Sequence, residues 1–259
     1  TSEGDTVGEG DNLSAATTPT KLTNICQINA LTYGVSGTVE VVGKYGRDSE
    51  LAYEGAKCSR DIKNAVDYDI GGRNQAKAAG EPRGIGSLLN YITNVRGDGD
   101  AGPSSANGTD LIGVGTESVF GQDDLDAAME QCYADGAKPR SMVTTAKQKA
   151  KFSVFDGAGT GDTSRTDRAA QTIYANADVY VSNFGTIDVL PSRHVHSVTG
   201  GDTVFLLDPE YLKVAYLRPW QQFDLAKIGD SMRREMVVEF TLEVSNQGAH
   251  AAIVGRDNA

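Results

Sequence analysis

Apolar residues recur at steps of three and four along one long stretch, which predicts a long helix. Asp48 stands in a helix-start signal, and the stripe that follows keeps one face apolar as far as Ile70. A helix over these residues would be about 35 Å long, and one that continued through Gly71 and Gly72 to Ala79 about 48 Å. The glycine pair is expected to kink the helix. The residues at this spacing are Leu51, Gly55, Cys58, Ile62, Ala65, Val66, Asp69 and Ile70.

Short apolar runs and alternating patterns predict strands on both sides of this helix. Residues 20–43 are rich in β-branched types at strand spacing, and Gly34 and Gly37 indicate a bend or bulge. A hairpin is predicted at Val179–Val181 and Ile187–Leu190. Further strands are predicted at Ser141–Thr144, Val204–Leu207, Leu212–Leu217 and Met236–Val244, with a turn at Arg218 and Pro219.

Two shorter helices complete the predicted elements. One starts at Asp123 and has Gly136 as its C-terminal cap, and the other covers Ala146–Phe155. Strands and helices do not alternate regularly, so the pattern predicts an α+β fold. The stretches at 1–18, 97–108 and 156–168 are polar and read as loops.

The charge balance excludes one class of function. The chain carries 35 acidic and 24 basic residues, a net charge of -11, whereas a dedicated nucleic-acid binder relies on Lys and Arg to neutralise phosphates. Cys26, Cys58 and Cys132 lie far apart with no Cys-x-x-Cys pair, so buried free thiols are expected. No apolar run reaches the roughly 20 residues of a membrane-spanning helix.

The sequence offers little catalytic chemistry. It contains no phosphate-binding loop and no nucleophile elbow, and no His, Ser or Cys arrangement converges. His194 and His196 would share one face of a strand, but a solvated strand end is the preferred interpretation. The acidic loops at 98–100 and 156–162 lack the spacing of a calcium loop. No cofactor or metal is expected, and a hydrolase with an acidic site stays a remote alternative.

Four stretches of the chain resemble one protein family. They are TPTKLTNICQINALTYGVSGTV (18–39), the long helix with its ending RNQAKAAG (73–80), DVYVSNFGTIDVLPSR (178–193) and DPEYLKVAYLRPWQQFDLAKIGDSMRREMVVEFTLEVSN (208–246). In this order they are similar to the major capsid proteins of tailed bacteriophages with the Hong Kong 97-type fold. The resemblance is strongest to the group related to the coliphage SU10 capsid protein.

The resemblance implies a fold with a peripheral domain, built from a long spine helix and a long β-sheet, an axial domain and an extended loop. Residues 1–43 would form the N-terminal segment with the distal part and return strand of that loop. Residues 44–110 would form the peripheral domain with the spine helix at 48–79. Residues 111–218 would form the axial domain, and 219–259 would return to the peripheral domain. Family members usually have an N-terminal arm and an outgoing loop strand before the position of Thr1.

The implied function is that of a structural shell subunit. Copies would assemble into pentamers and hexamers of an icosahedral head that encloses double-stranded DNA, with a negatively charged lumenal face. The implied partners are other copies of the chain, together with portal, scaffold, maturation protease or cement proteins, and no membrane. The implied location is the virion head, assembled in the host cytoplasm. An encapsulin-like compartment subunit is the alternative.

A subunit that self-associates needs side chains that contact another subunit. Two classes of residue are candidates: large aromatic anchors, for which core packing is an equally good interpretation, and arginines that could pair with an acidic loop of a neighbour. The ions at residues 233–235 fit a solvated strand edge equally well. The candidates are Tyr211, Tyr216, Arg218, Trp220, Arg233 and Arg234.

Overall fold

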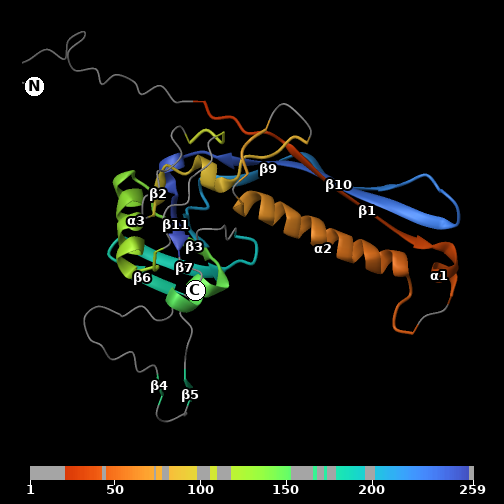
Figure 1. Cartoon of the computed structure of the whole chain (residues 1–259), viewed down its shortest axis with the longest axis horizontal. Helices are drawn as coiled ribbons and strands as arrows, with labels where there is room; N and C mark the ends of the chain where they lie inside the picture. Colours follow the sequence, from red (N-terminus) through yellow and green to blue (C-terminus); the bar gives the residue numbers. More distant parts are fainter. Residues whose placement is uncertain are drawn as a thin grey trace, which may run out of the picture.

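The structure is a computed structural model of the chain, shown in Figure 1. It describes residues 21–42, 45–72, 74–77, 82–97, 106–109, 118–152, 166–167, 172–173, 179–195 and 202–256. The predicted loop at 1–18 and both predicted acidic loops lie outside these residues. The mixture of helices and strands confirms the predicted α+β class.

A long antiparallel sheet of three strands forms one part of the molecule. β10 (Ser231–Val244) lies in its centre, between β1 (Gln27–Ser36) and β9 (Leu212–Asp224). The predicted strand at Met236–Val244 is confirmed and begins five residues earlier, because the polar residues after Ser231 also pair with β1. The expected strand over 20–43 ends at Ser36, where the chain enters the short helix α1 (Gly37–Val41).

The predicted turn at Arg218 and Pro219 is wrong. β9 runs straight through both residues, and the register with β10 shifts on either side of Arg218. β9 is an edge strand, so a proline that cannot donate a ladder hydrogen bond is tolerated at a bulge there. The sequence pattern alone could not distinguish a bulged edge strand from a turn.

The long helix α2 (Glu50–Gly71) lies alongside this sheet (Figure 1). Ser49 caps its N-terminus by accepting a hydrogen bond from the Ala52 N–H. The predicted spine helix at 48–79 is therefore too long at its C-terminal end. Gly72 is extended, and Lys77 pairs with Gly84 as an isolated bridge. The glycine pair ends the helix instead of kinking it, because glycine carries the highest helix cost of any residue except proline.

A six-stranded sheet lies near the C-terminal end of α2 (Figure 1). Its strand order is β2-β11-β8-β3-β7-β6. Its predicted strands at Ser141–Thr144 and Val204–Leu207 and its predicted hairpin at 179–190 are confirmed. The strands are β2 (Asn94–Arg96), β3 (Ser141–Thr144), β6 (Val179–Ser182), β7 (Gly185–Pro191), β8 (Asp202–Leu207) and β11 (Ala251–Arg256).

The remaining elements are short. Both shorter predicted helices are present among the described residues, and Gly136 has the positive φ of a left-handed cap. The elements are α3 (Gln122–Ala134), α4 (Ala146–Phe152), the 3-10 turns η1 (Leu88–Tyr91) and η2 (Gln247–Ala249), and the two-stranded pair β4 (Thr166–Asp167) and β5 (Thr172–Ile173).

Two apolar cores lie on opposite faces of the six-stranded sheet. On β8, Phe205 packs into the core shared with α2, η1 and β10, whereas Val204 and Leu206 pack into the core shared with α3. This follows from the strand period of two, which places successive side chains on opposite faces. The expected burial of free thiols is confirmed for Cys58 and Cys132, and Cys26 is half-buried.

The domain boundaries expected at 43/44, 110/111 and 218/219 stay predictions. β9 begins at Leu212, before the last of them, and continues without a break through it. β11 pairs with β8 and β2 in the six-stranded sheet, although its residues were expected to return to the peripheral part. The chain thus crosses between the two sheets more often than four consecutive segments imply.

Candidate assembly surface

The end of the long sheet farthest from the six-stranded sheet is a compact tip. Here α1 follows β1, and a loop at 225–230 joins β9 to β10 (Figure 1). The Gly37 N–H donates to the Asp230 carbonyl oxygen at 3.1 Å, which holds α1 against the loop. A Cβ at Gly37 would collide with the Asp230 carboxylate, so glycine permits this close approach.

Large apolar side chains are exposed together at this tip. Val41 is 84% exposed and Tyr45 fully exposed. Exposed apolar side chains that gather on one part of a surface indicate a protein contact. We call this set the distal surface: Val39, Val41, Val42, Tyr45, Leu225, Ile228 and Met232.

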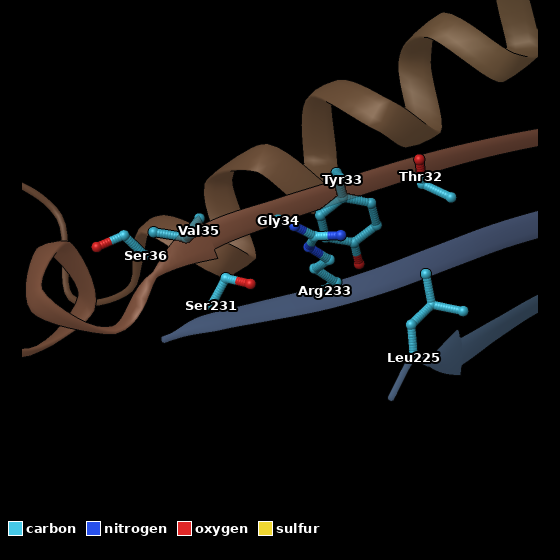
Figure 2. A pocket seen from close by; sticks show the side chains of 8 residues that line it. All are labelled: Thr32, Tyr33, Gly34, Val35, Ser36, Leu225, Ser231 and Arg233. Carbon is cyan, nitrogen blue, oxygen red and sulfur yellow. The ribbon is translucent and has the colours of Figure 1, made fainter. Parts of the chain in front are cut away.

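Hollows indent the tip beside these residues. Figure 2 shows one of about 460 Å³, lined by the end of β1, the start of β10 and Leu225. A Cβ on Gly34 would lie 2.9 Å from Cγ of Arg233, so the missing side chain makes room for the arginine. A second hollow of about 490 Å³ lies between α1 and the 225–230 loop and includes Val41 and Met232. Such hollows could receive side chains of another subunit.

A carboxylate fixes α1 onto the N-terminus of α2. Oε2 of Glu40 accepts hydrogen bonds from the N–H groups of Glu50 at 3.0 Å and Leu51 at 3.2 Å. These donors have no partner within the helix, and the positive end of the helix dipole favours an anion. The position of the distal surface is therefore coupled to the long helix.

The three predicted arginines have different surroundings. Arg233 is exposed at the distal surface, and no ion pair is found for it within the described part of the chain. Nε of Arg234 donates to Asp224 at 2.6 Å across the β9–β10 pair, which raises the pKa of the arginine. Arg218 pairs with Glu239. Pairing of these arginines with a neighbouring subunit stays a prediction, and Arg233 is the best placed for it.

The three predicted aromatic anchors also differ in burial and packing. Trp220 is half-buried and packs against the core beneath the long sheet, which favours the core interpretation for it. Tyr211 is half-buried in the turn between β8 and β9, where its N–H donates to the Asp208 carbonyl oxygen. Tyr216, on the edge strand β9, is 48% exposed and stays a candidate for contact with another subunit.

A buried carboxylate bridges two arginines on the long sheet. Glu239 is 5% exposed, and it accepts from Nε of Arg218 at 2.7 Å and from Nη2 of Arg83 at 3.0 Å. These bonds, that of Arg218 first, lower the pKa of Glu239 although its desolvation acts in the opposite direction. Arg83 lies 156 residues from its partner. The sequence carried no signal for this cluster.

The residues of the distal surface were also missed. Their one sequence signal is a set of apolar residues beside turn-forming ones, such as Ile228 next to Gly229 and Asp230. Val41 and Val42 suit the strand that was predicted over residues 20–43, so the pattern did not indicate an exposed surface.

The candidate assembly surface gathers apolar and charged side chains, which suits a contact with protein. No group of His, Cys, Asp and Glu suited to a metal ion is found in the described part of the chain. His194 lies in a bend after β7, and His196 lies outside the described residues. Among the described helices, none is both long and apolar enough to cross a membrane.

Comparison with known proteins bears on the family and the fold. A model of the SU10 major capsid protein family matches residues 3–257. No curated protein matches by sequence. Solved structures share the fold at low identity. One is the SrpI encapsulin complex of Synechococcus elongatus PCC 7942, with a TM-score of 0.58 and 9% identity over 90% of this chain and 75% of that one.

Two phage structures give similar values. The structure of Mycobacterium phage Adephagia matches with a TM-score of 0.57 and 14% identity, over 99% of this chain and 82% of that one. The satellite phage P4 procapsid matches with a TM-score of 0.53 and 13% identity, over 99% and 79%. The chain therefore belongs to the SU10 major capsid protein family, and it is a capsid shell subunit with the Hong Kong 97-type fold.

Proposed function

We propose that copies of this chain form pentamers and hexamers, which close into the icosahedral head shell that encloses double-stranded DNA. The distal surface carries the proposal, because it gathers exposed apolar side chains, hollows and Arg233, which has no ion pair among the described residues, at one end of a long sheet. A closed shell needs contacts between unlike surfaces of identical subunits. Many modest contacts, summed over neighbours, then give a stable assembly.

The shell is tested by electron microscopy of the purified full-length protein. We expect capsomers or closed shells at micromolar protein concentration. A chain that stays a folded monomer over a wide range of concentration, salt and pH would contradict the proposal.

An encapsulin-like compartment is the second candidate, favoured by the similarity to the SrpI encapsulin fold. The two kinds of shell differ in what they enclose. Shells isolated from producing cells are treated with nuclease and then analysed for protected DNA and for enclosed protein. Protected DNA of uniform length supports the phage head, whereas a stoichiometric second protein without DNA supports the compartment.

The remaining expectations belong to the same proposal. Portal, scaffold, maturation protease and cement proteins are the proposed partners beyond the chain itself, and assembly takes place in the host cytoplasm. The role is structural, without enzymatic turnover. A lumenal face with net negative charge would keep the packaged DNA mobile, in line with the net charge of -11.

A further inference from the structure

The cluster of Arg83, Arg218 and Glu239 has unused binding capacity. Each arginine gives one nitrogen to the buried carboxylate, and each side chain is still 46% exposed. A guanidinium has five N–H donors, so most of them have no partner within the described part of the chain. Two cations around one anion leave the cluster with a net positive charge.

The cluster is also rigidly held. Both oxygens of Glu239 are engaged, and the residue lies in the central strand of the long sheet. Ile28, its register partner on β1, lies on the same face of the sheet and is 43% exposed. Fixed guanidinium groups beside an apolar side chain suit a carboxylate-bearing peptide, because a planar guanidinium binds a carboxylate through two parallel hydrogen bonds.

We propose that Arg83 and Arg218 bind carboxylates of the N-terminal segment, residues 3–11, of a second copy of the chain. This inference rests on the shell function proposed above and names one of its contacts. The segment is complementary in charge, since no lysine or arginine precedes Lys21. Its acidic residues are Glu3, Asp5, Glu9 and Asp11.

The direction of the chain favours a second copy over the same one. Gln27 is opposite Phe240, next to Glu239, but Asn24 already bonds to the Leu242 carbonyl oxygen. Toward its N-terminus the chain therefore moves along β10 away from the arginine pair. The described residues before β1 thus lead away from the chain's own arginine pair, whereas an adjacent copy can present its pair to the segment.

The test uses two full-length variants that each lack one half of the contact. The first carries Arg83→Gln, Arg218→Gln and Glu239→Gln, so that no buried charge is left without a partner. The second carries Glu3→Gln, Asp5→Gln, Glu9→Gln and Asp11→Gln. Lys63→Gln, on the exposed side of α2, is the matched control for loss of a cation. Circular dichroism melting checks the fold of each.

We expect each variant alone to need an about tenfold higher protein concentration for assembly than the wild type and the Lys63→Gln control, the scale of one charge-assisted contact. An equimolar mixture should recover part of the loss, because the intact segment of the first variant meets the intact arginines of the second. Assembly is measured by analytical sedimentation at constant salt.

Two results would overturn the inference. Normal assembly of the first variant means that the arginines bind no subunit, and absence of recovery in the mixture places the contact within one chain. If the first variant does not fold, a variant with Arg83→Lys and Arg218→Lys takes its place. It keeps a positive charge beside Glu239 but removes the planar guanidinium groups, and it should weaken assembly as well. If the wild type itself never assembles, the shell proposal fails, and self-association of the unassembled chain by sedimentation equilibrium still tests the contact.

Discussion

Neighbouring arginines on one strand have unlike surroundings in this molecule. Arg233 and Arg234 are adjacent, yet strand geometry sends their side chains to opposite faces of the sheet. Arg234 meets Asp224 on β9, whereas Arg233 crosses above Gly34 toward the hollow at the tip. Register therefore decides which charge is satisfied within the chain and which is left for a neighbour.

Arg233→Glu should abolish or strongly reduce shell formation while the monomer keeps its fold. Arg234 is left unchanged, because a glutamate there would face Asp224 and destabilise the hairpin itself. The measurement is electron microscopy together with thermal melting, and Lys63→Glu on α2 is the charge-matched control. Shells of normal yield from Arg233→Glu would remove this residue from the interface.

His250 makes the joint between the two sheets sensitive to acid. It is fully buried after η2, and its Nδ1 accepts a hydrogen bond from the Asp208 N–H at 3.2 Å. Burial lowers the pKa of the imidazole, although the nearby Asp208 carboxylate and a backbone hydrogen bond with Tyr211 act in the opposite direction. Protonation would convert the accepting nitrogen into a donor and break the bond.

A lowered pKa in the folded state means that the unfolded chain binds the proton more tightly. The stability linked to His250 is therefore fully present above the ordinary histidine pKa of about 6.5 and is lost as the pH falls toward the lowered value. Chemical unfolding of the wild type should show this decline, and His250→Gln, whose amide oxygen can still accept, should not. An identical pH dependence of the two proteins would contradict the assignment.

At the scale of elements, capping determines where the long helix begins and how it holds the tip. Ser49 and Glu40 together satisfy N–H groups of the first turn of α2. Ser49 is local in sequence, while Glu40 comes from α1. The distal surface thus depends on an interaction that spans a loop.

Glu40→Ala should lower the free energy of unfolding by about 1–2 kcal/mol, because two helix N–H groups lose a charged acceptor. It should also weaken assembly by releasing α1 from α2. Urea unfolding gives the first quantity and sedimentation the second. Glu54→Ala, at a half-buried position of the same helix and paired only with Lys57 among the described residues, is the control with little expected effect. Equal stability of the two variants would show that the cap contributes nothing.

The whole molecule combines a charged surface with an apolar one at the proposed contacts. Ion pairs through Arg233 or through the pair at Glu239 are screened by salt, whereas burial of the distal surface is not. Between about 0.1 M and about 1 M salt, the Debye length falls from about 10 Å to about 3 Å.

Assembly should therefore require a higher protein concentration in about 1 M NaCl than in about 0.1 M. The dependence should be weaker for Arg233→Glu, if that variant assembles at all. Light scattering against protein concentration at several salt concentrations measures it. Assembly that is independent of NaCl would leave the apolar surface as the sole contact.

Much of this molecule is predictable from local pattern. The long helix, the hairpin at 179–190 and the strand at Ser141–Thr144 each follow from a periodicity that a few adjacent residues define. The series at 208–246 carried enough of the family's motif to indicate fold and shell function. Of the proposed contact residues, however, only Tyr216, Arg218 and Arg233 were foreseen, whereas Arg83 and the apolar residues of the distal surface were not.

The amino-acid sequence by itself determined the position of most helices and strands, and the family, because spacing and motif are local properties of the chain. The tertiary structure decided the rest. Whether Pro219 turns the chain or lies in an edge strand depends on which strand pairs beside it. Whether an arginine is paired depends on partners such as Glu239 and Arg83, 156 residues apart. Exposure of Val41 and Val42 depends on what the whole fold leaves uncovered.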